Sequence, residues 1–164
     1  MVVPPDVVIR PIRPEDRDLL AAAHARLSDE TKRRRYLVPK PRLTSRELSY
    51  LTEVDGIDHV ALIAQSADDG ELLGVARFVR VPGDPETAEA AIVVADACQG
   101  QGLGRRLGQA LSDAARERGV RRFSATMLSD NAAAHRLFAS ISRRLDSRHE
   151  GGVEELVAEL PAAA

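Results

Sequence analysis

The periodicity of hydrophobic and polar positions changes along the chain and predicts strands that alternate with helices. Apolar runs of strand length occupy residues 6–13, 59–65, 72–81, 86–95 and 121–128. Helices are expected over residues 14–27, 29–35, 44–53, 102–118 and 130–140, and the first and the fourth of these show an amphipathic spacing. A final hairpin is expected over residues 143–160, with its turn at Gly151-Gly152. This order of elements predicts an α+β domain with a mixed sheet, but it does not determine the order of the strands.

Turn and cap residues mark several boundaries within this pattern. Asp29 is expected to cap the helix over 29–35, and Gly119 to end the helix over 102–118. Residues 82–85 contain two prolines and are expected to form a loop before the next strand.

Composition narrows the class of protein. A chain of 164 residues fits one domain spanning residues 1–164, with an aliphatic core because tryptophan is absent. The formal net charge of −2 argues against a general nucleic-acid binder. Cys98 is the only cysteine, and no apolar run is long enough for a signal peptide or a membrane span. These features predict a cytoplasmic protein without a metal site, whose oligomeric state stays open, with a homodimer as one alternative.

The segment Gln99-Gly100-Gln101-Gly102-Leu103-Gly104 lies between a predicted strand and a predicted helix. A glycine turn in this position presents backbone N–H groups to a phosphate at the positive end of the helix dipole. At Gly102 and Gly104 the missing Cβ would let phosphates approach the main chain. The spacing differs from the dinucleotide-binding fingerprint, so another phosphate ligand is expected.

The spacing Gln-x-x-Gly-x-Gly after a strand resembles the pyrophosphate motif of the GNAT family of acyl-CoA-dependent N-acyltransferases. Residues 131–138 are similar to the family's second motif, Asn-x-x-Ala-x-x-Leu-Tyr, and residues 74–78 and 88–94 resemble its third and fourth strands. The resemblance extends from Leu72 to about Phe138. It implies a mixed, mostly antiparallel central sheet flanked by helices, and acetyl-CoA as co-substrate for transfer to a primary amine.

The resemblance also implies which residues hold acetyl-CoA. The pyrophosphate would lie against Gln99, Gly100, Gln101, Gly102, Leu103, Gly104 and Arg105. Main-chain groups of Ile92, Val93 and Val94 would bind the pantetheine arm as an added strand does. Asn131 would either reach this arm or cap the following helix. Arg105 and Arg106 would either contact phosphate or form a solvated helix face.

Glu89 is the candidate general base, because it stands in the fourth strand where many family members carry a catalytic glutamate. Its apolar neighbours predict partial burial, which would raise its pKa. The alternatives are a solvated carboxylate or one paired with an arginine such as Arg77.

Phe138 departs from the family pattern, which often has a tyrosine that protonates the departing thiolate. The motif also ends in Ser142-Arg143 rather than Gly-Phe. A second function therefore stays open: a catalytically weak acyl-CoA-binding sensor or regulatory domain. His135 and Ser140 are expected to be ordinary helix-surface residues.

The N-terminal half gives a narrower resemblance. Arg13–Asp16, Arg26–Ser28 and Arg35-Tyr36 are similar to bacterial protein lysine acetyltransferases in which a GNAT domain accompanies a regulatory domain. Protein lysine is therefore the leading acceptor, against a small-molecule amine. The run Lys32–Arg35 is interpreted as a solvated helix face, with binding of an acidic substrate or the CoA 3′-phosphate as the alternative. Cys98 is interpreted as an apolar filler.

Overall fold

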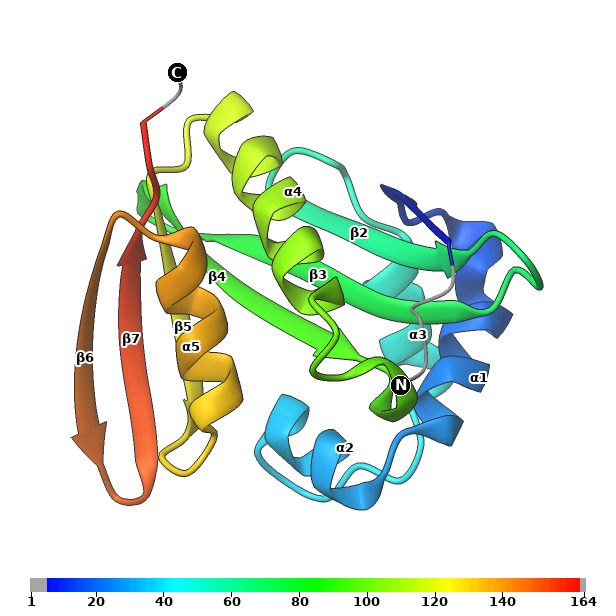
Figure 1. Ribbon diagram of the computed structural model, residues 1–164. Coiled ribbons are helices and arrows are strands. Elements are labelled where there is room, and N and C mark those ends of the chain that lie inside the picture. Colours follow the sequence, from blue (N-terminus) through cyan, green and yellow to red (C-terminus); the bar gives the residue numbers. More distant parts are fainter. Residues whose placement is uncertain (1–5, 163–164) are drawn as a thin grey trace.

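The computed structural model describes residues 6–162, in which seven strands form one twisted sheet in the order β1-β2-β3-β4-β5-β7-β6 (Figure 1). Neighbouring strands are antiparallel except β4 and β5, which are parallel. The strands are β1 (Val7–Pro11), β2 (His59–Ser66), β3 (Leu72–Val81), β4 (Asp84–Val94), β5 (Arg122–Leu128), β6 (Arg144–Glu150) and β7 (Val153–Glu159).

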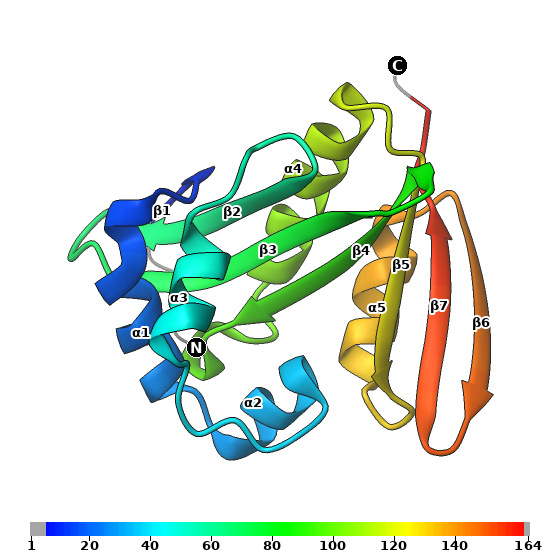
Figure 2. The ribbon, with the colours of Figure 1, turned by 180° about the vertical axis from the view of Figure 1, so that it is seen from behind.

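Helices cover the two faces of this sheet unequally. They are α1 (Arg17–Arg26), α2 (Asp29–Tyr36), α3 (Ser45–Thr52), α4 (Leu103–Glu117) and α5 (Ala132–Ile141), with 3₁₀ turns at Pro14–Asp16 and Asp96–Cys98. Figure 1 shows α4 and α5 on one face, and Figure 2, seen from behind, shows α1 and α3 in front of β1–β3 on the other. No helix among residues 6–162 is both long and apolar enough to cross a membrane.

Two hydrophobic layers explain this arrangement. On α4, Leu103, Leu107, Leu111 and Ala115 recur every four residues and are all buried against the sheet. Their layer continues through Phe78, Phe123 and Leu156. On the opposite face, α1 and α3 cover Ile63 and Val75 with Leu20 and Leu51. The strands of the central sheet are therefore apolar on both faces, which accounts for their continuous hydrophobic runs.

The predicted elements are all present, with boundaries that differ by a few residues at most. The loop expected over residues 82–85 is shorter, because β4 already begins at Asp84 after a turn at Gly83. The proposed cap of α2 is wrong. Ser28, not Asp29, precedes the helix, and its hydroxyl accepts the Thr31 N–H.

Candidate active site

A cleft of about 450 Å³ opens between β4 and β5. The two strands pair only where Thr87–Glu89 lie beside Arg122–Ser124. Beyond this point they diverge, so Ala90–Val94 and Ala125–Met127 line opposite walls. Within the described residues, one edge of β4 therefore has no strand partner along the cleft, as the addition of an extended ligand requires.

Most of the predicted cofactor-binding residues line this cleft: Ile92, Val93, Val94, Gln99, Gly100, Gly102, Gly104, Arg105 and Asn131. Two others do not contribute side chains to it. Leu103 is buried in the core, and the Gln101 amide donates to the carbonyl of Ala97. Their backbone N–H groups still belong to the glycine turn.

The glycine turn is suited to an anion. The backbone N–H groups of residues 103–105 open helix α4 and donate to no acceptor among residues 6–162. Gly100 and Gly102 have φ values of +76° and +86°, and a Cβ at either position would meet no atom within 4 Å. The turn therefore offers unused donors and open space, which fit a pyrophosphate.

Gly104 also lines the cleft, but it lies nearer to neighbouring side chains than the other two glycines. A Cβ at this residue would lie 3.4 Å from Leu137 and 3.6 Å from Val94. These are ordinary van der Waals distances, so a Cβ would fit at Gly104 with less free space around it than at Gly100 or Gly102.

Helix α2 lies beside the cleft and contributes Thr31, Arg34 and Arg35 to its lining. The interpretation of Lys32–Arg35 as a solvated face is therefore wrong except for Arg33, which is exposed. Lys32 is buried, and its ammonium donates to the carbonyl of Pro41. Sequence periodicity missed these residues because α2 is polar on nearly every side and shows no apolar stripe.

Asp96 attaches α2 to the glycine turn. Its carboxylate accepts the Ser28 N–H and the Thr31 hydroxyl, both at 3.1 Å. The Gln99 amide donates to the Thr31 Oγ1 at 3.3 Å and to the carbonyl of Val94 at 3.0 Å. These hydrogen bonds to Ser28 and Thr31 lower the pKa of Asp96 against the opposing effect of burial.

The second motif supplies the wall formed by α5. The Asn131 Oδ1 accepts the Ala134 N–H, so this residue caps α5 at the edge of the cleft. Phe138 is buried between the cleft and the core. His135 is not an ordinary surface residue, because its Nδ1 lies 2.7 Å from the buried carboxylate of Glu154.

Glu89 lies on β4 one residue before the cleft wall begins. Alternation along the strand buries Ala88 and Ala90 against α4 and turns Glu89 to the opposite face. The expected partial burial is therefore wrong, and the side chain is exposed. The alternative of a pair with Arg77 does not hold either, because Arg77 bonds to Leu51 and His59.

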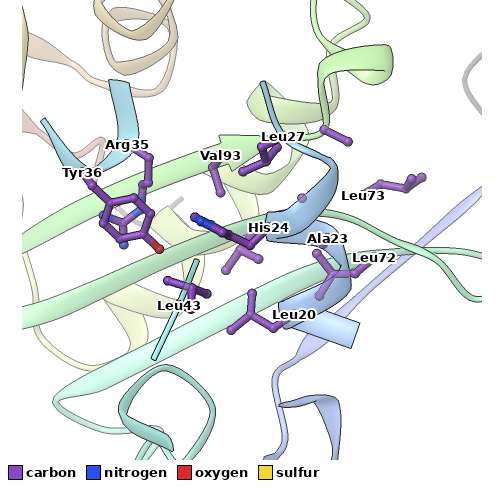
Figure 3. A pocket seen from close by; sticks show the side chains of 13 residues that line it. Leu20, Ala23, His24, Leu27, Arg35, Tyr36, Leu43, Leu72, Leu73 and Val93 are labelled. Atoms are coloured by element: carbon purple, nitrogen blue, oxygen red, sulfur yellow. The ribbon is translucent and has the colours of Figure 1, made fainter. Parts of the chain in front are cut away.

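A smaller, apolar pocket of about 40 Å³ lies under α1 on the other face of the sheet (Figure 3). It shares Arg35 and Val93 with the cleft, so the two cavities adjoin at β4. The His24 Nε2–H donates to the carbonyl of Lys40 at 2.8 Å. Burial lowers the pKa of His24, which favours the neutral form of the imidazole.

Cys98 also borders the cleft, but it is buried. Burial raises the pKa of its thiol, which disfavours the nucleophilic thiolate. Residues 6–162 also contain no cluster of three or more side chains suited to a metal ion.

Comparison with protein families places these features in a known context. Residues 24–141 match the model of the acetyltransferase (GNAT) family. The chain belongs to this family. The resemblance and the GNAT fold predicted from the sequence are thus confirmed.

Individual GNAT relatives support this assignment. The chain is 38% identical over 130 residues to acetyltransferase Pat of Mycolicibacterium smegmatis, covering 79% of this chain and 38% of Pat. It is 34% identical to acetyltransferase PA5475 of Pseudomonas aeruginosa, covering 79% of this chain and 68% of that protein. The crystal structure of the GNAT domain of S. lividans PAT superposes with a TM-score of 0.84 at 33% identity, covering 93% and 89% of the two chains.

Proposed function

We propose that this protein transfers the acetyl group of acetyl-CoA to a primary amine by direct attack, with Glu89 as general base. The observation that carries the proposal is the continuous cleft from the glycine turn along the unpaired edge of β4. Glu89 lies at the end of this edge, where the strands β4 and β5 meet. We place the reaction in the cytoplasm as part of the same proposal.

Acetyl-CoA would use the two ends of this cleft differently. The N–H groups at the start of α4 would bind its pyrophosphate, and Arg34, Arg35 and Arg105 add positive charge along the same cleft. The pantetheine arm would then run along Ile92–Val94 and exchange hydrogen bonds with the strand. This direction brings the thioester toward Ala90, next to Glu89.

Deprotonation of the amine is the step that needs a base. An amine with a pKa of about 10.4 is neutral in about 1 molecule in 2,500 at pH 7, which corresponds to about 4.6 kcal/mol. Glu89, directly or through water, would accept this proton. The amine nitrogen then bonds to the thioester carbon, and the carbon–sulfur bond breaks.

The departing CoA thiolate must also be accommodated. Phe138 offers no proton, so solvent would protonate the sulfur. A thiol with a pKa of about 8.5 leaves readily as thiolate, and the reaction does not depend on an acid at this position.

Protein lysine is the acceptor we propose, with a small-molecule amine as the alternative. The resemblance of Arg13–Asp16, Arg26–Ser28 and Arg35-Tyr36 to bacterial protein lysine acetyltransferases supports it, as does the similarity to Pat. The open, exposed environment of Glu89 is compatible with an acceptor side chain on a protein surface.

The test is release of free CoA from acetyl-CoA in the presence of amines and lysine-containing proteins. Affinity for acetyl-CoA is measured in parallel by calorimetry. Turnover with at least one acceptor is the expected result. Tight binding of acetyl-CoA without turnover on any acceptor would contradict the proposal and favour a sensor or regulatory domain.

A further inference from the structure

Arg77 is a buried cation for which residues 6–162 supply no counter-anion. It lies in the middle of β3, and only 6% of its surface is exposed. Its Nη1 donates to the carbonyl of Leu51 at 3.0 Å and lies 3.0 Å from the His59 Nε2. Among residues 6–162 it forms no ion pair with a carboxylate.

His59 does not neutralise this charge. A guanidinium has only N–H donors, so the His59 Nε2 must accept the hydrogen bond and its proton must lie on Nδ1. Burial and the charge of Arg77 lower the pKa of His59 to about 4. The imidazole is therefore neutral near pH 7 and cannot act as an acid or a counter-ion.

The surrounding groups add positive charge and hydroxyls. Burial lowers the pKa of Arg77 to about 10, and the positive charge of Arg35 acts in the same direction. The Arg35 guanidinium lies 4.6 Å from the centre of the Tyr36 ring. Tyr50 is 58% exposed, and its ring centre lies 5.0 Å from that of His59. An uncompensated buried charge is costly, and a second cation nearby raises this cost.

Arg77 lies on the strand next to β4, which carries the proposed base Glu89. Arg77 pairs directly with Ala91 on β4, and Ala91 lines the acetyl-CoA cleft. Arg77 itself lines neither cavity, and its Nη1 bonds toward α3 and β2, on the side of β3 away from β4. A carboxylate in the cleft would reach the guanidinium over the methyl group of Ala91. Glu89 lies two residues earlier on the same face of the sheet, one diagonal step from Arg77.

We propose that Arg77, with Arg35 and Tyr50 around it, forms a subsite for a carboxylate carried by the amine acceptor. The amine would face Glu89 while the carboxylate pairs with the guanidinium. An amino-acid-like amine meets this description, as does a protein lysine followed by an acidic residue. This inference rests on the proposed function and specifies its acceptor.

The test compares acceptors that differ only in the carboxylate. One pair is an amino acid and its α-amide, and the second is a lysine peptide with Glu or Gln after the lysine. The value of kcat/KM is measured by CoA release for the intact chain. Loss of a charge pair of this kind typically costs about 30-fold or more, so the carboxylate member of at least one pair should be favoured by that factor.

Variants then assign the preference to Arg77. Arg77→Met should abolish it, Arg77→Lys should retain part of it, and activity on the uncharged acceptor should change little. Arg33→Gln is the matched control, because Arg33 is an exposed arginine on α2 outside both cavities. Circular dichroism and acetyl-CoA affinity check that each variant is folded. If Arg77→Met does not fold, the carboxylate preference of the unmodified protein and its reduction in Arg77→Lys still test the proposal.

Three results would overturn the inference. The first is the absence of any preference in the unmodified protein. The second is an equal loss on both members of a pair in Arg77→Met, which makes the role of Arg77 structural. The third is a preference for succinyl-CoA over acetyl-CoA regardless of acceptor, which would assign the carboxylate to the acyl donor.

Failure of the proposed function would look different. No acceptor would then be acetylated, although acetyl-CoA binds. Calorimetric titration of the CoA-loaded protein with the amino acid and its amide would decide the subsite in that case. Binding of the amino acid alone supports it, and equal or absent binding of both contradicts it.

Discussion

Glu89 and Gly102 carry the proposed chemistry at the scale of single residues. Glu89 is exposed on β4, and its alternation with buried alanines fixes the direction of the carboxylate. Gly102 provides a left-handed turn with open space in front of the first N–H groups of α4. Glu89 would accept the proton of the amine, and Gly102 would leave room for the pyrophosphate of acetyl-CoA.

Replacing Glu89 by Gln should separate catalysis from binding. The amide keeps the size of the side chain but cannot accept the amine proton, so turnover near pH 7 should fall by about 10²–10⁴-fold. Acetyl-CoA affinity should stay the same, and higher pH should partly restore turnover because more free amine is available. The control is Glu86→Gln, because Glu86 lies on the same strand as Glu89 and forms only an exposed ion pair, with Arg121. Equal turnover of Glu89→Gln and the unmodified protein would exclude Glu89 as the base.

Replacing Gly102 by Val should prevent acetyl-CoA binding, because the branched side chain would occupy the open space over the turn. The φ of +86° also strains any residue with a Cβ, at a cost of about 1–2 kcal/mol in folding stability. Gly119→Val is the matched control, since Gly119 has a φ of +80° and open space at the far end of α4. Calorimetry should show loss of binding only for Gly102→Val. If Gly119→Val also loses acetyl-CoA binding, backbone strain rather than the occupied space at Gly102 is the cause.

At the scale of elements, α2 depends on its contacts with the turn before α4. It is short and nearly all polar, so it has little apolar surface to bury. Asp96, Thr31 and Gln99 therefore fix its position beside the cleft through hydrogen bonds.

Removing this attachment should loosen α2. In Asp96→Ala the Ser28 N–H and the Thr31 hydroxyl lose their acceptor, which should cost about 1–3 kcal/mol of local stability. Hydrogen exchange over residues 29–36 should accelerate, and acetyl-CoA affinity should fall because Arg34 and Arg35 are no longer held at the cleft. The control Asp113→Ala breaks an exposed ion pair with Arg116 on α4, and it should change neither the exchange of residues 29–36 nor the acetyl-CoA affinity. Unchanged exchange in Asp96→Ala would show that α2 is held by other contacts.

At the scale of the whole molecule, buried histidines couple stability to pH. The folded-state pKa of His59 is about 4, below the value of about 6.5 expected in the unfolded chain. The unfolded state therefore binds more protons in this range, and stability must fall as the pH drops from about 6.5 to about 4. Buried His24, whose pKa is also lowered, acts in the same direction.

Urea unfolding between pH 7.5 and 4 should reveal this loss. His59 accounts for about 3 kcal/mol when its full shift is expressed. His59→Gln keeps an acceptor for Arg77 and does not titrate, so its stability should depend less steeply on pH over the same range. If the free energy of unfolding depends on pH equally steeply in His59→Gln and the unmodified protein, His59 is not responsible for the loss of stability.

The sequence determined the elements, the family and the glycine turn. Hydrophobic periodicity and turn residues are local properties, so the boundaries of α4, β3 and the β6–β7 hairpin could be read from them. The glycine turn is likewise a local arrangement, and the structure has unused N–H groups where the motif predicts them. Local sequence was sufficient because neighbouring residues form these features.

Only the tertiary structure decided what surrounds each candidate residue. The exposure of Glu89 depends on which face of β4 meets α4. Arg34 and Arg35 reach the cleft because Asp96, more than 60 residues away, holds α2. The isolation of Arg77 follows from strand register and from α3 above it. Contacts between distant segments set burial and charge environment, and a local pattern does not contain them.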